Sequence, residues 1–203
     1  CAWNINNTDI DKFSDIFIQN TYQPLDINTA NIIKDIYIML STPPNQIVWH
    51  DFWRHPLSKK LSSWPDNSKI QQKILWLEWT INTINNKINY AEKHIKQNND
   101  NFDILKFIIH ATSFYKYKLQ TSLMISDFMN NKIYNKDSIL YVIDENINLI
   151  EQLKNEYNKI WLKYYKPENL YLINLKFERL SQYFKEIQLD ILNNSLKQPD
   201  IES

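Results

Sequence analysis

The chain has 203 residues, and its 23 Lys plus Arg balance its 23 Asp plus Glu, so its formal net charge is zero. This length can bury the core of one medium-sized domain, and the balance gives no electrostatic reason to expect DNA, RNA or an anionic membrane as a partner. The absence of glycine excludes the Walker loop and the dinucleotide-binding fingerprint, which require it. The single cysteine excludes an internal disulfide.

Residues 1–41 predict a short strand followed by two short helices. Ala2 to Ile5 is typical of a strand, and the first helix should begin near Asp9 and end before Pro24. The second should run from Thr29, or the residue before it, to Ser41. The inner face of the first helix is expected to consist of residues at helical spacing, namely Phe13, Ile16, Phe17 and Asn20.

Residues 42–67 predict an irregular connection rich in tryptophan and proline. Loops of this length in compact domains are usually functional or packed on another element, so this is the best candidate for a site or an interface. We expect its aromatic residues to anchor it on the helices, with the neighbouring polar residues in solvent. The alternative, a polar pocket lined by the cluster, stays open. The anchoring residues are Trp49, Phe52 and Trp53, and the polar residues expected in solvent are His50, Asp51 and Arg54. His50 and His55 flank the cluster that would line the pocket.

Residues 68–195 predict four long helices, because apolar residues recur there at steps of three and four. The helices should run from Ser68, Phe102 and Ser138, and the fourth should start at Pro167. Asparagines replace glycine near the expected helix ends, as the next residue most tolerant of left-handed backbone. Short turns favour antiparallel packing. The sequence thus predicts an all-α fold, an antiparallel bundle of about four long helices preceded by two short helices and a strand-like segment.

No catalytic or metal-binding pattern is present on these helices. A carboxylate-bridged di-metal centre needs paired Glu-x-x-His motifs, and His94 and His110 stand without a companion at that spacing. No serine or cysteine has a histidine partner in view. The acidic residues of the long helices, including Glu156 and Glu186, are expected in solvated faces or ion pairs.

One family resemblance centres on a corner between two long helices, residues Lys166 to Asn169. The segments 161–163, 166–170 and 177–180 read Trp-Leu-Lys, Lys-Pro-Glu-Asn-Leu and Phe-Glu-Arg-Leu. Together they resemble the end of the helical C-terminal domain of bacterial family 20 glycoside hydrolases, the β-N-acetylhexosaminidases. The chain departs from the pattern at Tyr165, where the family has Asn, and at Asn169, where it has Gly.

Two shorter segments are similar to the same family in the same order. Ala2-Trp3-Asn4 resembles its last barrel strand, and His55-Pro56-Leu57 resembles a short motif that follows the barrel. The resemblance implies that residues 1–41 end a (β/α)8 barrel, that 42–67 connect it to a long-helix bundle at 68–195, and that 196–203 form a tail.

The resemblance also implies the chemistry. The family hydrolyses terminal N-acetylhexosamine with retention, and its Asp-Glu pair would lie upstream of Cys1, so no catalytic residue is expected in this chain. Trp3 would be a wall of the sugar pocket, with Asn4, Trp49 and Trp53 at its rim. No metal or organic cofactor is implied. The implied partners are a carbohydrate with a terminal N-acetylhexosamine, the barrel domain and a second copy of the chain.

A second hypothesis stays open, in which the chain is a stand-alone helical binding or scaffold protein without catalysis, anchored by a lipid on Cys1. The coding sequence before Cys1 distinguishes the two hypotheses. Neither involves a nucleic acid or a membrane-spanning segment, since no apolar run approaches about 20 residues. The preferred hexosamine and the location, cytoplasmic or exported, are left open by the sequence.

Overall fold

The computed structural model describes residues 10–42, 47, 49–58, 67–96, 101–130 and 135–196. Every regular element within these ranges is helical, which confirms the all-α class for this part of the chain. The expected strand, with Trp3 and Asn4, lies outside it. The elements are α1 (Ile10–Tyr22), α2 (Ile27–Ser41), α3 (Trp49–Trp53), α4 (Asn67–Ala91), the 3-10 turn η3 (Glu92–His94), α5 (Asn101–Met129), α6 (Lys136–Tyr164) and α7 (Leu170–Leu192).

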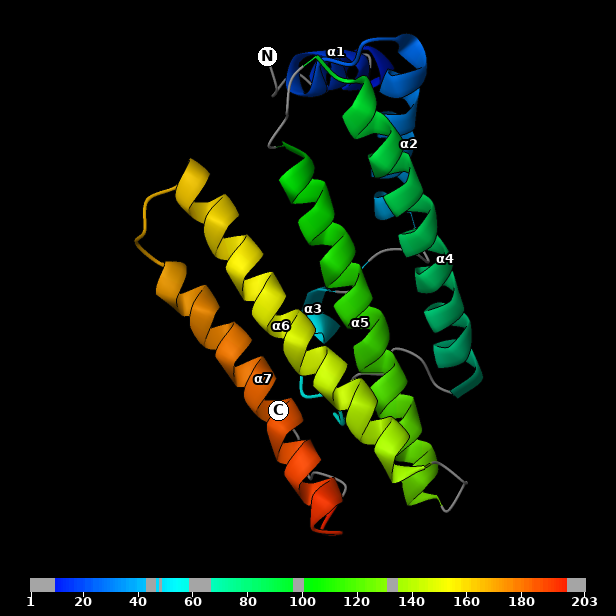
Figure 1. Cartoon of the computed structure of the whole chain (residues 1–203), viewed down its shortest axis with the longest axis vertical. Coiled ribbons are helices and arrows are strands. Elements are labelled where there is room, and N and C mark those ends of the chain that lie inside the picture. The colour runs from blue at the N-terminus through cyan, green and yellow to red at the C-terminus, as the bar shows by residue number, and fades with distance from the viewer. Residues whose placement is uncertain are drawn as a thin grey trace.

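The four long helices run alternately up and down, and α5, α6 and α7 each pack beside the long helix that precedes them (Figure 1). The apolar steps predicted for α4 and α7 face the interior, because their residues are buried or partly buried. One buried cluster joins α3, α5, α6 and α7 around Phe114, Phe177 and Phe184. A second cluster joins α1 and α2 to α4 and the start of α5 around Ile33, Ile84 and Phe102.

The prediction of which residues form the inner face of α1 is wrong. Phe13, Ile16 and Phe17 are 57%, 50% and 41% exposed. Asn20 is exposed as well. The buried residues are instead Ile18 and Tyr22. Tyr22 sets this orientation, because its ring packs 5.0 Å from that of Phe102 (centroid to centroid), and its hydroxyl lies 2.6 Å from that of Tyr37.

The 166–169 corner differs from the prediction at its helix start. α7 begins at Leu170, because the chain first makes a turn in which the Leu170 amide donates to the Pro167 carbonyl at 3.1 Å. The Trp161 indole closes the corner by donating to the Lys166 carbonyl at 2.7 Å. Asn169 has a φ of 70°, in the left-handed region. A position where the family pattern has glycine therefore has the backbone conformation that glycine adopts most easily.

The backbone of Asn169 leads to a stability prediction. Asn169→Gly should leave the free energy of unfolding within about 0.5 kcal/mol of wild type, whereas Asn169→Ala should lower it by about 1 kcal/mol, because a Cβ without a polar group is disfavoured in left-handed backbone. Urea denaturation measures both. Asn155→Ala, on the exposed face of α6, is the control and should not be destabilising. An Asn169→Ala variant as stable as wild type would contradict the assigned conformation.

Candidate functional site

The short helix α3 is held on the long helices by a buried aromatic residue. Phe52 is 1% exposed, and its ring centroid lies 4.9 Å from that of Phe114 on α5. The rings of Trp49 and Trp53 pack on Phe52 at 5.3 and 4.8 Å. Trp53 also reaches α7, where its ring lies 5.1 Å from Phe177. The connection between α2 and α4 is thus fixed to the bundle through α3, which the sequence did not predict as a helix.

Lys118 on α5 fixes the end of α3. Its side chain is fully buried, and Nζ donates to the backbone carbonyl oxygens of Asp51, Phe52 and Arg54 at 2.6, 2.9 and 2.5 Å. Carbonyls at a helix end have no partner within the helix, and three of them match the three N–H bonds of an ammonium group. Burial lowers the pKa of Lys118 to about 7, against the attraction of the Asp51 carboxylate.

The expectation that Asp51 and Arg54 stay in solvent is wrong. Asp51 is 3% exposed, and its Oδ1 accepts a hydrogen bond from Arg54 Nη1 at 3.1 Å, while the Arg54 side chain is only one-quarter exposed. Both are enclosed because two side chains of α5 bind the backbone of residues 51–56. Lys118 binds the carbonyls described above, and Ser122 Oγ donates to the Pro56 carbonyl at 2.6 Å. The side chain of His50 lies outside the described part of the structure.

A pocket opens where this segment meets α7. It has a volume of about 390 Å³, within the range of small-molecule sites. Its walls come from two stretches of chain far apart in sequence, and we call it the Trp53 pocket. It is lined by Trp53, Arg54, His55 and Ser58 from the segment after α2, and by Lys176, Arg179 and Tyr183 from α7.

The Trp53 pocket combines positive charge with aromatic rings. Lys176 Nζ lies 5.8 Å from the centroid of the Trp53 ring. Arg179 Nε donates to the Tyr183 hydroxyl at 2.5 Å, and the Tyr183 ring packs on His55 with centroids 4.7 Å apart. Among the residues that the structure describes, no acidic side chain lines this pocket. Chemically, such a surface suits a ligand that carries an anionic group beside a ring.

His55 contributes as a neutral imidazole. Burial lowers its pKa, as does the nearby Lys118, while Glu186 acts in the opposite direction. The Leu57 amide donates to His55 Nδ1 at 3.1 Å, which requires an unprotonated Nδ1 and therefore leaves the proton on Nε2. The positive charge of the pocket at neutral pH accordingly comes from its arginines and its lysine.

The sequence-predicted sugar residues are not gathered at one place in the described structure. Trp53 lines the pocket. Trp49 is 48% exposed and packs on Phe52 outside the pocket lining. Trp3 and Asn4 lie outside the described ranges, so their roles stay predictions.

Three lining residues on α7 were not predicted as site residues. Lys176, Arg179 and Tyr183 stand at steps of three and four, each one position before a buried residue of the apolar stripe. This spacing places them on one edge of the helix. A search for polar residues repeating beside the stripe could have found them, and only Arg179 was noted, as part of the family pattern.

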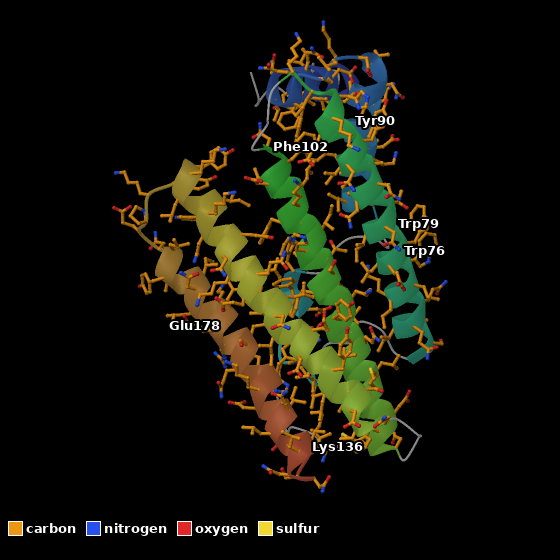
Figure 2. All side chains as sticks on the ribbon, viewed as in Figure 1. Trp76, Trp79, Tyr90, Phe102, Lys136 and Glu178 are labelled. Atoms are coloured by element: carbon orange, nitrogen blue, oxygen red, sulfur yellow. The ribbon has the colours of Figure 1, made fainter. Side chains whose placement is uncertain are left out.

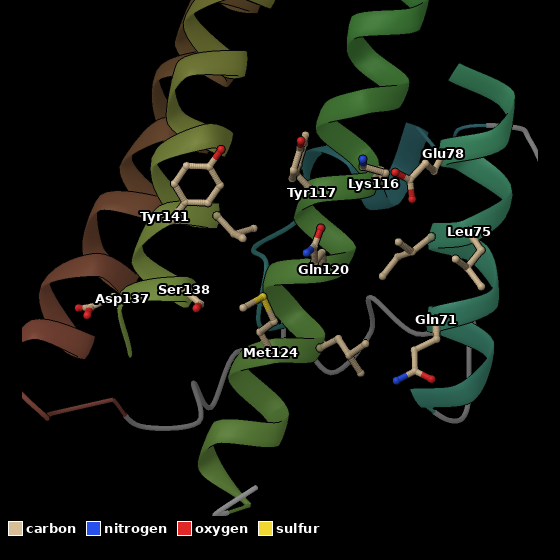
Figure 3. A pocket seen from close by; sticks show the side chains of 13 residues that line it. Gln71, Leu75, Glu78, Lys116, Tyr117, Gln120, Met124, Asp137, Ser138 and Tyr141 are labelled. Atoms are coloured by element: carbon tan, nitrogen blue, oxygen red, sulfur yellow. The ribbon is translucent and has the colours of Figure 1, made fainter. Parts of the chain in front are cut away.

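A second, wider groove of about 930 Å³ lies along α5, between α4 and α6. Figure 3 shows Gln71, Leu75 and Glu78 on its α4 side and Tyr141 on its α6 side. Its charges are mixed, since Glu78 and Asp137 oppose Lys116. Its chemistry therefore selects no ligand class as clearly as that of the Trp53 pocket.

His110, which stands alone in the sequence, has a partner across α5 and α6. Its Nδ1 lies 2.7 Å from Glu156 Oε1, and the Gln152 amide donates to the same carboxylate oxygen at 2.9 Å. The described ranges contain no group of three or more His, Cys, Asp or Glu that could hold a metal ion. The contact of His110 with Glu156 joins α5 to α6.

Comparison with protein-family models, curated proteins and solved structures gives no match. The family resemblance therefore rests on the sequence segments quoted above. Among the described helices, none has the length and apolar character needed to cross a bilayer.

Proposed function

We propose that this chain is the helical C-terminal part of a glycoside hydrolase that acts on terminal N-acetylhexosamine residues, and that it supports a (β/α)8 barrel carrying the catalytic Asp-Glu pair. The observation that carries the proposal is the backbone of Asn169. The main departure of the chain from the family pattern falls at this glycine position, and its φ of 70° is a conformation that Asn tolerates better than most residues.

Trp161, the other part of the corner that resembles the family pattern, supports the same proposal, because its contacts give that pattern a physical reason. The Trp161 indole donates to the carbonyl of Lys166, and its ring packs on Tyr157 and Tyr165 at centroid distances of 5.8 and 4.8 Å. The family pattern of a Trp followed a few residues later by a basic residue and Pro thus has a structural reason. The Trp side chain closes the corner by binding the backbone of the basic residue. The motif supports a fold like that of the family's helical domain, and it contains no catalytic group.

The exposed apolar face of α1 supports the proposal that a further domain packs against this end of the chain. Phe13, Ile16 and Phe17 stand at steps of three and one, on one face of the helix, and all are more than two-fifths exposed. On α2, Ile27 and Ile38 are 80% and 52% exposed. Figure 1 shows these two helices together at one end of the molecule. Exposed apolar side chains that share a face, as the three on α1 do, mark an interaction site more often than open surface, and the proposed barrel would cover them.

The proposal assigns the sugar-binding role mainly to residues outside this structure. Trp3 would form a wall of the sugar pocket, and Asn4, Trp49 and Trp53 would contribute at its rim. Trp49 presents half of its side chain to solvent, as a rim residue does. The remaining helices would act as a rigid support.

Hydrolysis of an aryl N-acetyl-β-glucosaminide tests the proposal. The protein made from the complete reading frame that contains these 203 residues should release the aryl alcohol, and the 203 residues alone should release none. The matching aryl β-glucoside, which lacks the acetamido group, should not be hydrolysed, because that group supplies the nucleophile in this family.

Two results would contradict the proposal. One is a complete protein that hydrolyses neither the glucosaminide nor the galactosaminide, which would favour the non-catalytic binding protein. The other is turnover by the 203 residues alone, which would place the catalytic groups within this chain.

A further inference from the structure

We propose that the Trp53 pocket binds a small ligand that carries a phosphate or carboxylate group next to a sugar-sized ring. This inference goes beyond the proposed function and does not depend on it, because Lys176, Arg179 and Tyr183 are not among the proposed sugar-site residues and its test measures binding. It rests on the charges, the aromatic surface and the size of the pocket.

The charges of α7 in this pocket are not neutralised within the described structure. Lys176 and Arg179 pair there with no carboxylate, whereas their neighbour Glu178 is paired across to Lys154 at 3.1 Å. Figure 2 shows Glu178 on the side of α7. The third cation, Arg54, is balanced by Asp51. Two unbalanced positive charges one helical turn apart repel each other, and a bound anion would relieve that repulsion.

The arginine is held in position for an anion. Its Nε donates to the Tyr183 hydroxyl at 2.5 Å, one turn along the same helix. The remaining four N–H bonds of the guanidinium are on its two terminal nitrogens, the pair that forms two parallel hydrogen bonds with phosphate or carboxylate oxygens. Fixing Nε reduces the side-chain entropy that binding would cost.

The aromatic residues favour a ring beside the anionic group. Trp53 and Tyr183 both line the pocket, and aromatic faces suit the apolar face of a pyranose. The Trp53 ring is fixed by its contacts with Phe52 and Phe177. The volume of about 390 Å³ lies at the small end of ligand sites, which favours a monosaccharide over a long oligosaccharide.

Three probes that differ only at one carbon of the same hexose test the inference: glucose 6-phosphate, glucuronate and glucose. Each is titrated into the natural full-length protein while the indole N–H resonances are followed by NMR. The Trp53 resonance, assigned by its loss in Trp53→Phe, should shift with the two anions, with a dissociation constant of about 1 mM or tighter. It should not shift with glucose. The two anionic probes distinguish phosphate from carboxylate, and inorganic phosphate reports the contribution of the ring.

Charge-removing variants locate the binding. Lys176→Gln with Arg179→Gln should weaken binding of the anionic probes by at least about tenfold, the effect expected from losing charged hydrogen-bond donors. Lys185→Gln is the control, because it removes one positive charge from an exposed position of α7 outside the pocket lining. It should change the dissociation constant by less than about twofold.

Several outcomes would overturn the inference. They are an unshifted Trp53 resonance at saturating anion, binding of glucose as tight as that of its charged analogues, or equal weakening by the double variant and by the control. Circular dichroism of each variant shows whether its helices are retained. Binding that weakens as salt is raised would support the charge-based mechanism.

Discussion

Lys118→Met should lower the free energy of unfolding by about 3–5 kcal/mol, because it removes the donor shared by three buried carbonyl oxygens, and each lost partner costs about 1–3 kcal/mol. Of the three, the Asp51 carbonyl keeps the Arg54 amide as a second donor, at 3.3 Å. Met has nearly the same length as the aliphatic part of lysine, so the variant removes the donor with little change in volume. The three acceptors lie 2.5 to 2.9 Å from Nζ, in the buried interior of the molecule. The hydrogen bonds that are lost all lie at the end of α3.

Urea denaturation of wild type and variant measures this difference. Lys185→Met is the control, since Lys185 is exposed on α7, and it should stay within about 0.5 kcal/mol of wild type. A Lys118→Met variant as stable as the control would show that the ammonium group does not bind α3. The hydrogen bonds of Lys118 would then not be what holds residues 49–58 on the bundle.

Phe52→Ala is expected to be the second large effect, at about 3–5 kcal/mol, which is typical when a buried aromatic residue is replaced by alanine. Phe52 is 1% exposed and is the residue of α3 that packs on Phe114. Trp49→Ala is a matched control in the same helix. It removes a larger ring, but that ring is 48% exposed, so the loss should be smaller than for Phe52.

The combination of the two changes tests whether they act through one element. Since Phe52 and Lys118 both hold α3, the double variant should lose less stability than the sum of the single losses. Denaturant midpoints of the two single variants and the double variant form the cycle. Fully additive losses would contradict a shared role in docking α3.

The long helices could be predicted from the sequence because their apolar residues repeat with the helical period over many turns. Phe177, Leu180 and Phe184 are buried as that period requires. The inner face of α1 could not be predicted so well, because its apolar residues cover more than one face. The face that turns inward carries Ile18 and Tyr22, and Tyr22 contacts Phe102 and Tyr37, which lie far from it in the sequence.

The Trp53 pocket could be predicted only in part. The aromatic cluster near Trp53 marked the segment, but its partners Lys176 and Arg179 stand on the last long helix, and no local pattern connects the two stretches. Lys118 did leave a signal, because it is a charged residue next to Leu119 on the buried side of α5. Such a residue must either find partners or lose its charge, and the carbonyls of α3 are those partners.

The central claim is that the 49–58 segment is a fixed part of the bundle and builds a pocket with α7. Its most direct test is a proton NOE measurement between the Trp53 and Phe177 rings in the natural full-length protein. With ring centroids 5.1 Å apart, strong cross-peaks are predicted in wild type and should weaken or vanish in Lys118→Met. Absence of these cross-peaks from the folded wild-type protein would contradict the claim.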